Sequence, residues 1–326
     1  MRAYAIRRIL LMIPTLLVAS FIVFCMIRLV PGDVVEMMAA QTEAVTQMDV
    51  EALRHALGMD VPIFTQYGRW MGVLPGADGS ISGIFQGDLG TSLWDQTNVS
   101  EQILTRVPVT LELALLALAI SLLIAMPIGI YSALRQDTWG DYIARSFAIG
   151  CIAIPGFWLG TMIIVFPSIW WGYAPPMLLV QFFEDPIGNL QMFIIPSTIL
   201  GMVTSGIIMR MTRTMVLEVL RQDYIRTAWA KGLKERRVIL RHALKNALIP
   251  VVTVIGLWMP VAIGGTVIIE QIFNLPGMGR LFLDAIFLRD YPIVSGVAFV
   301  FGASMVFINL MVDLTYGFLD PRVHYK

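Results

Sequence analysis

Six apolar runs, each close to the length of a membrane span, most limit what this chain can fold into. They cover residues 9–30, 111–131, 143–171, 193–211, 247–269 and 294–314. An α-helix needs about 20 mostly apolar residues to cross the hydrocarbon core of a bilayer, where only its internal hydrogen bonds can satisfy the backbone. The runs therefore predict an all-α polytopic membrane protein with six transmembrane helices.

Composition supports the same class. Hydrophobic residues make up 57% of the chain and charged residues 14%, whereas charged residues make up roughly 25% of an ordinary soluble domain. The formal net charge is zero, so nothing in the charge balance favours nucleic acid as a partner. We expect the main environment of this chain to be the lipid membrane.

The distribution of basic residues predicts the orientation of the helices. If the N-terminus is cytoplasmic, all but six of the 23 lysines and arginines fall in segments or span ends that face the cytoplasm. The exceptions are Arg28, Arg54, Arg69, Arg106, Arg280 and Arg289. Loops rich in Lys and Arg stay on the cytoplasmic side of a membrane. We therefore expect a multi-pass protein of the plasma (inner) membrane with both termini in the cytoplasm.

These expectations divide the chain into four regions. They are an N-terminal tail with the first helix (1–30), an extracytoplasmic insertion (31–108), a five-helix core (109–317) and a cytoplasmic tail (318–326). The insertion is acidic, because it has three arginines and ten carboxylates. The carboxylates are Asp33, Glu36, Glu43, Asp49, Glu51, Asp60, Asp78, Asp88, Asp95 and Glu101. It is interpreted as a folded cap on the spans, or alternatively as a surface that contacts a soluble binding protein.

The segment 218–246 is densely basic and lies between two apolar runs. Its charged residues include Lys231, Lys234, Glu235, Arg236, Arg237 and Arg241. Placed mid-bilayer, six such charges would cost roughly 15 to 20 kcal/mol, so the segment must lie in water or against another protein. Tyr224, Ala228 and Gly232 fall at i, i+4 and i+8, and Ile225 and Trp229 at i and i+4. This spacing predicts a short helix with one apolar face, suited to a groove on a partner.

The sequence of this segment resembles the cytoplasmic coupling loop of ABC importer permeases, in the dipeptide and oligopeptide branch. The stretch that carries the resemblance is RTAWAKGLKERRVILRHALKNALIPVV. In the general pattern of that superfamily, Glu-Ala-Ala is followed by three residues, Gly, nine residues and Ile-x-Leu-Pro. Aligned on Gly232, only Ala228, Gly232 and Leu244 match this form. The departures are typical of the peptide branch. The stretches RLVPGD (28–33), GGTVIIEQIFNLPGMGRL (264–281) and LMVDLTYGFLDPRV (310–323) resemble the same branch.

The resemblance implies the type I permease fold of these importers, an assembly and a coupling site. The implied partners are a second homologous permease subunit, two ATPase subunits and an extracytoplasmic solute-binding protein. The residues implied to couple the chain to an ATPase are Tyr224, Ile225, Arg226, Thr227, Ala228, Trp229, Gly232 and Leu244. We expect Tyr224, Ile225, Ala228 and Trp229 to enter the ATPase groove, and Gly232 to allow the sharp exit from the helix.

Sequence motifs indicate that this chain does not hydrolyse ATP. A phosphate-binding loop of the form G-x-x-x-x-G-K-[ST] does not occur in it. We therefore expect a non-catalytic subunit without a cofactor of its own, with ATP and magnesium bound by the partner ATPase. Two cysteines and three histidines, scattered along the chain, give no pattern of metal ligands.

Few residues stand out as candidates for the transport path. Glu112 lies near the end of a predicted span, where an ionisable residue is a functional candidate by default. Alternatively, Glu112 is an ordinary carboxylate at the membrane interface without a role in transport. Gly264 and Gly265 could permit bending or close helix contact during gating, although glycines are also simply common in transmembrane helices.

Two other functions stay open beside an importer of dipeptides or oligopeptides. One is an importer of the same family for nickel chelates or oligosaccharides. The other is a secondary carrier that needs no ATPase.

Overall fold

The computed structural model describes residues 2–28, 51, 54–55, 58–76, 79–172 and 178–319. Parts of the predicted insertion and nearly all of the predicted tail (318–326) lie outside these residues. The helices are α1 (Arg2–Arg28), α4 (Ile63–Trp70), η1 (Ile84–Gln86), α5 (Val99–Leu134), α6 (Trp139–Ala153), α7 (Gly156–Trp171), α8 (Pro186–Leu220), α9 (Asp223–Ala230), α10 (Glu235–Arg237), η2 (Val238–Ala243), α11 (Leu244–Ile272), α12 (Met278–Leu288) and α13 (Tyr291–Leu319). The predicted all-α class is confirmed, and the described residues contain only one isolated β-bridge.

The chain forms two compact units. The first comprises Met1–Ile6, Val109–Pro276 and Phe307–Lys326, and the second comprises Arg7–Pro108 and Gly277–Val306. The four regions expected from the sequence divide the chain by side of the membrane, whereas these units divide it by packing.

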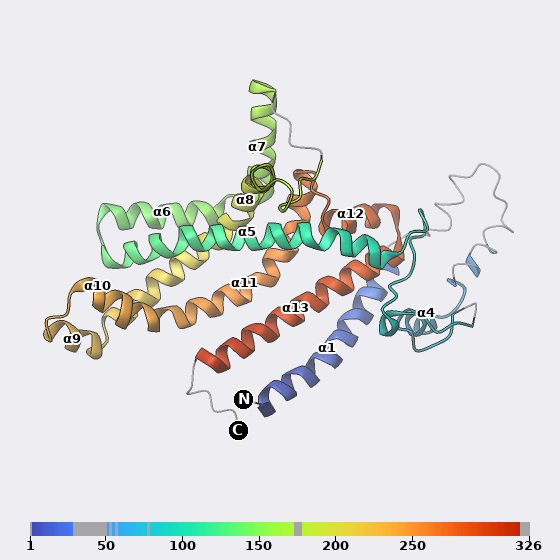
Figure 1. The fold of residues 1–326 in the computed structure, drawn as a ribbon, viewed down its shortest axis with the longest axis horizontal. Coiled ribbons are helices and arrows are strands. Elements are labelled where there is room, and N and C mark those ends of the chain that lie inside the picture. The colour runs from blue at the N-terminus through green and yellow to red at the C-terminus, as the bar shows by residue number, and fades with distance from the viewer. Residues whose placement is uncertain are drawn as a thin grey trace. The chain divides into compact units, whose positions relative to one another are not determined.

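Four helices of the described chain are long and apolar enough to cross a membrane, in α1, α5, α8 and α13. The number rises to six if each of two bent helix pairs forms one span. The predicted third span, 143–171, corresponds to one of these bent pairs, α6 and α7, and is not a single continuous helix. α6 and α7 meet at 89°. Figure 1 shows that α7 runs in a different direction from α6. The break falls at Ile154, which is extended with ψ 120° before Pro155, because proline disfavours the helical conformation of the residue before it.

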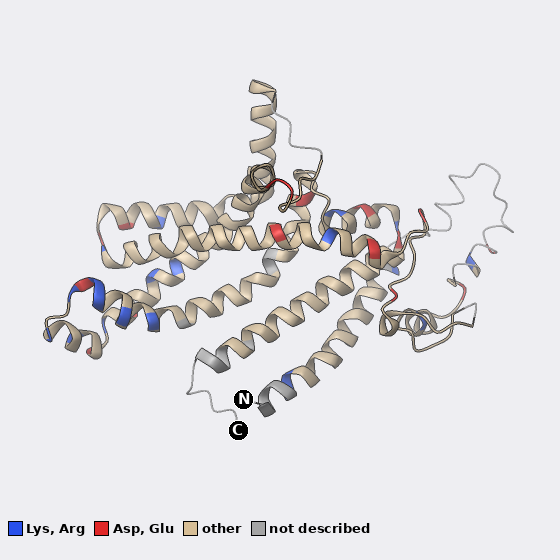
Figure 2. Cartoon of the chain, in the orientation of Figure 1, with Lys and Arg blue, Asp and Glu red and all other residues tan. Residues whose placement is uncertain are grey.

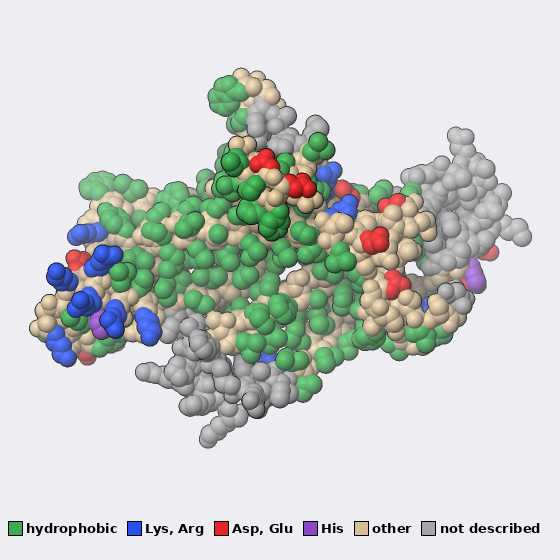
Figure 3. Space-filling view, in the orientation of Figure 1, with side chains coloured by type: hydrophobic (Ala, Val, Ile, Leu, Met, Phe, Trp, Pro, Cys, Tyr) green, Lys and Arg blue, Asp and Glu red, His purple; other side chains and the backbone are tan. Residues whose placement is uncertain are grey.

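Helix α8 is the centre of the first unit and packs against α6 and α11. Close packing depends on two small residues of α8. A Cβ added to Gly201 would lie 2.6 Å from the carbonyl oxygen of Ala117, and one added to Gly206 would lie 2.7 Å from that of Ala148. Only glycine permits such backbone contact, which is a common way for transmembrane helices to associate. The outer faces of α5 and α6 carry apolar side chains (Figure 3), as expected of helices that face lipid.

In the second unit, aromatic side chains of α1 and α4 pack together. Phe24 of α1 contacts Tyr67 and Trp70 of α4 with ring centroids 5.3 Å apart in both pairs. Within this unit, Ser92 of the loop before α5 donates a hydrogen bond at 2.5 Å to Oδ2 of Asp290, which lies between α12 and α13. Burial raises the pKa of Asp290, and the hydrogen bonds from Ser92 and the Leu93 amide partly offset that rise.

Candidate coupling segment and transport path

The segment 218–246 forms one end of the first unit. α8 ends at Leu220, and α9, α10 and the π-helical turn η2 lead into α11. Lysines and arginines gather around α9 and α10, while the long helices carry few charges (Figure 2). The predicted short helix is present as Asp223–Ala230.

Only part of the apolar face that the sequence predicted for α9 is buried within the chain. Ile225 and Ala228 are buried against Val238 and Ala243 in a small core of the chain itself. Tyr224 and Trp229, in contrast, are each 44% exposed. Residues 225 and 228 are three apart and share one side of the helix, so they anchor α9, and the exposed aromatic side chains are left for a partner.

The end of α9 is a Schellman motif. The N–H of Gly232 donates to the carbonyl of Trp229 at 2.9 Å, and the N–H of Leu233 donates to that of Ala228 at 3.4 Å. These are the two bonds of this C-cap, which requires a left-handed residue at the position of Gly232. Its φ is +72°, and Leu233 packs on the core around Ile225. The predicted sharp exit at Gly232 is thus present in the backbone.

Other coupling candidates take different places. Arg226 and Thr227 are exposed, and Arg226 pairs with Asp223 at 3.4 Å. Leu244 is partly buried against Ala133, Val216 and Ala247, so it stabilises the root of the loop. Sequence reasoning missed Asn246, whose side-chain amide donates to the hydroxyl of Tyr224 at 2.9 Å. A polar residue 22 positions from its partner gives no periodic signal.

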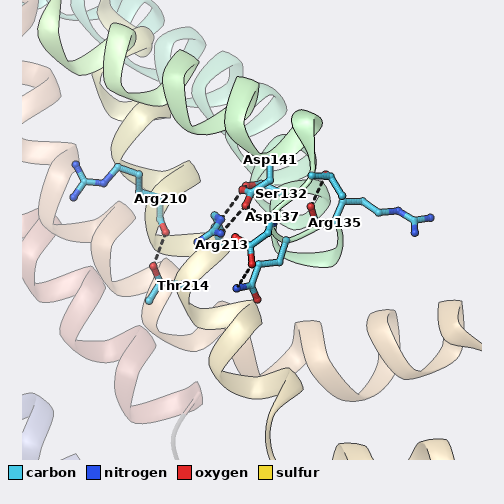
Figure 4. Close-up of polar contacts among 9 residues, drawn as sticks. Ser132, Arg135, Asp137, Asp141, Arg210, Arg213 and Thr214 are labelled. Carbon is cyan, nitrogen blue, oxygen red and sulfur yellow. Dashed lines mark hydrogen bonds and ion pairs between the residues drawn. The ribbon is translucent and has the colours of Figure 1, made fainter.

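A buried ion pair links three helices of the first unit and was also missed. Arg213 of α8 donates from Nε to Asp141 Oδ1 and from a terminal nitrogen to Oδ2, both at 2.8 Å. The hydroxyl of Ser132 and the amide of Asp137 also donate to this carboxylate, as Figure 4 shows. The Asp141 side chain is fully buried and that of Arg213 is 20% exposed. The ends of α5, α6 and α8 are therefore held by charge-assisted hydrogen bonds.

The candidates for the transport path, Glu112, Gly264 and Gly265, have different surroundings. Gly265 lines a largely apolar cavity of about 280 Å³ between α7, α8 and α11. Gly264 is exposed, with no described atom within 4 Å of the place a Cβ would take. Glu112 does not line that cavity, and one of its carboxylate oxygens is buried without a hydrogen-bond partner among the described residues. Their roles in gating or transport stay predictions.

The chain matches known families and proteins over most of its length. Residues 125–325 match the family described as "Binding-protein-dependent transport system inner membrane component", and residues 1–114 match its N-terminal companion family. A peptide transport system permease protein of Brucella suis is 39% identical over 325 residues, 100% of both chains. An oligopeptide transport system permease protein of Bacillus subtilis is 39% identical over 331 residues, again 100% of both.

Two further similarities extend this comparison. A glutathione transport system permease protein of Salmonella paratyphi A is 36% identical over 99% of both chains. A crystal structure of an amino acid ABC transporter with histidines matches 67% of this chain and 94% of its own, with a TM-score of 0.53 and 13% identity. At that identity the match concerns the fold alone.

Proposed function

This chain belongs to the family of inner membrane components of binding-protein-dependent transport systems, and on that premise we propose that it is a permease subunit for short peptides. Membership makes it a membrane permease subunit, not an enzyme, that works with an ATPase and a solute-binding protein. It also removes the secondary carrier as an alternative. We further propose that a second, homologous permease subunit and two ATPase subunits complete the transporter.

The proposed substrate class rests on the relatives. The names of the full-length relatives specify peptides, oligopeptides and glutathione, and these solutes share a peptide backbone with free charged ends. Identity near 39% along the whole chain supports extending this class to the present protein. We therefore propose di- to oligopeptides as the solute.

The proposed coupling depends on how α9 is held. The buried side chains Ile225 and Ala228 tie α9 to Val238 and Ala243 of the segment that leads into α11. A push on the exposed side of α9 would therefore move the end of α8 and the start of α11 together. We propose that Tyr224, Thr227 and Trp229, all exposed, contact the partner ATPase, which binds ATP and magnesium. The basic residues that follow hold the loop at the membrane surface.

This mechanism requires both termini and the loop 218–246 in the cytoplasm, and 31–108 outside. The asymmetry of the basic residues supports that orientation. A solute that enters from the outer side would then pass the apolar cavity that Gly265 lines. Glu112 is proposed to act on the same path.

Uptake into proteoliposomes tests the proposed function. The chain is purified with its co-expressed subunits and assayed with the binding protein, ATP and a panel of di- to oligopeptides, a nickel chelate and an oligosaccharide. ATP-dependent uptake of peptides alone is expected. Uptake of only the chelate or the sugar would replace the proposed solute while keeping the family, and flux without ATP would reject the mechanism.

Replacing Trp229 with alanine tests the proposed contact with the ATPase. The side chain is 44% exposed and anchors no core cluster, so the variant should assemble in the membrane normally. Buried aromatic anchors typically contribute more than about 2 kcal/mol to an interface, and we expect peptide uptake to fall at least about tenfold. The matched control is Trp139→Ala, which removes a more exposed tryptophan outside the loop. Equal effects in both variants would contradict the contact.

A further inference from the structure

The second unit contains a cavity of about 250 Å³ that the transport mechanism above does not use. Helices α1, α4 and α13 and the loops around residues 58 and 93 line it. Ligand pockets have volumes of roughly 300 to 1,000 Å³, so this cavity is slightly smaller than that range. It has space for one amino-acid residue but not for an extended peptide.

Three hydrogen-bonding groups of this cavity are buried and unsatisfied. The Nε of Arg69, the indole Nε1 of Trp70 and the hydroxyl of Ser295 have no hydrogen-bond partner among the described residues. All three residues line the cavity, and Ser295 is 2% exposed. A buried donor without a partner typically costs about 1 to 3 kcal/mol. Several such donors around one cavity indicate an acceptor ligand.

Arg28 adds a second cation to the same cavity. Its Nε donates to Gln66 Oε1 at 2.9 Å, and its guanidinium lies 3.4 Å from the centre of the Phe24 ring. An arginine guanidinium stays protonated at neutral pH. Two arginines therefore face the cavity, and in the described part of the chain no aspartate or glutamate lines it. A buried cation needs a counter-charge or strong hydrogen bonds.

We propose that this cavity binds the carboxylate end of a small solute, with Arg69, Trp70 and Ser295 as its hydrogen-bond donors and Arg28 as a second positive charge. The guanidinium of an arginine can donate two parallel hydrogen bonds to one carboxylate. The rings of Phe24, Trp70 and Tyr291 also line the cavity and would pack on the side chain beside the carboxylate. This inference rests on the proposed function, because it identifies the solute as a peptide with a free C-terminus.

The aromatic wall favours an organic carboxylate over a bare anion. Inorganic phosphate or a lipid phosphate would use the same donors but would leave the apolar wall uncovered. The C-terminal residue of a peptide supplies the carboxylate and, where its side chain is apolar, an apolar group attached to the adjacent Cα. The predicted orientation places Arg28 and Arg69 among the few basic residues outside the cytoplasm, where an incoming solute would first meet the permease.

Equilibrium binding to the purified complex in nanodiscs, without the binding protein, tests the site. The probes are the radiolabelled dipeptide alanyl-phenylalanine and its C-terminal amide, with inorganic phosphate as a competitor. We expect the acid to bind and the amide to bind at least about tenfold more weakly, because charge-assisted hydrogen bonds are lost. Arg69→Gln should weaken binding of the acid at least about tenfold. Its control, Arg280→Gln, removes an arginine that pairs with Asp284 outside the cavity.

Ser295→Ala separates a binding role from a structural one. Removing an unsatisfied buried hydroxyl should leave the melting temperature unchanged or higher, while binding of the acid weakens several-fold. The control on the same helix is Ser304→Ala, whose hydroxyl already donates to the Val300 carbonyl at 2.8 Å.

Either of two results would overturn the site: equal binding of acid and amide, or displacement of both by inorganic phosphate at the same concentration. Peptide uptake without a preference for the acid would reject the site and keep the proposed function. Binding of the acid that Arg69→Gln weakens, without any ATP-driven uptake, would keep the site and reject the function.

Discussion

Replacing Gly232 with valine is expected to abolish ATP-driven uptake while leaving the chain inserted and assembled. No described atom lies within 4 Å of the place that a Cβ of Gly232 would take, so the effect cannot come from a clash. It comes from the backbone, whose φ is +72°. A left-handed conformation costs an L-residue about 1 to 2 kcal/mol, and a β-branched residue is especially disfavoured there. Such an amount changes a conformational ratio by a factor of about 5 to 30.

The strain should release the C-cap of α9. Without it, the N–H groups of residues 232 and 233 lose their bonds to Trp229 and Ala228, and Leu233 leaves its place on the core around Ile225. The last turn of α9, which carries Trp229, then no longer holds one position for the ATPase. The measurement is peptide uptake together with the ATPase activity of the complex, and we expect hydrolysis to continue without transport.

An asparagine at the same position is the decisive comparison. Asparagine tolerates the left-handed region far better than other residues with a side chain, so Gly232→Asn should retain most uptake and Gly232→Ala should fall between the two variants. Equal loss in all three would mean that the absence of a side chain matters, as at a tight interface. Normal uptake with valine would contradict the role of this turn.

The sequence predicts where the helices of this fold lie along the chain better than it predicts which surfaces they pack against. The membrane spans and α9 could be predicted because their hydrophobic patterns lie within short, continuous stretches of sequence. Pro155 marks the break between α6 and α7 in the sequence. The residues on both sides of it nevertheless form one apolar run, and hydropathy does not show where a helix changes direction. The assignment of Ile225 and Ala228 to a partner surface illustrates the limit. Periodicity finds an apolar face and does not say whether the chain or a partner covers it.

Polar contacts between distant segments were not predictable for a different reason. Asp141 and Arg213 are 72 positions apart, and nothing in the sequence distinguishes them from other charged residues near the ends of the apolar runs. The cavity of the second unit likewise joins Arg28, Arg69 and Ser295 from three helices. No single segment contains the pattern, since only the packing of α1, α4 and α13 places these groups together.

Breaking the ion pair between Asp141 and Arg213 is expected to produce the largest loss of stability. Replacing Arg213 with methionine keeps most of the side-chain volume but leaves a fully buried carboxylate without its cation. Removing one partner of a buried pair typically costs about 3 to 5 kcal/mol. Asp141→Asn should cost less, because Arg213 is 20% exposed and its long side chain can reach water. The measurement is the melting temperature of the purified complex and the amount assembled in the membrane.

The double variant decides whether the pairing itself matters. Replacing both residues, Asp141→Asn with Arg213→Met, removes both charges, so it should recover part of the stability that Arg213→Met loses, giving a coupling between the two sites. The matched control is Arg210→Gln, one turn earlier on α8, whose exposed side chain points away from Asp141 (Figure 4). It should melt like the unmodified protein. Additive losses in the double variant would mean that each residue acts through separate contacts, and the link between α5, α6 and α8 would then depend on apolar packing, not on the ion pair.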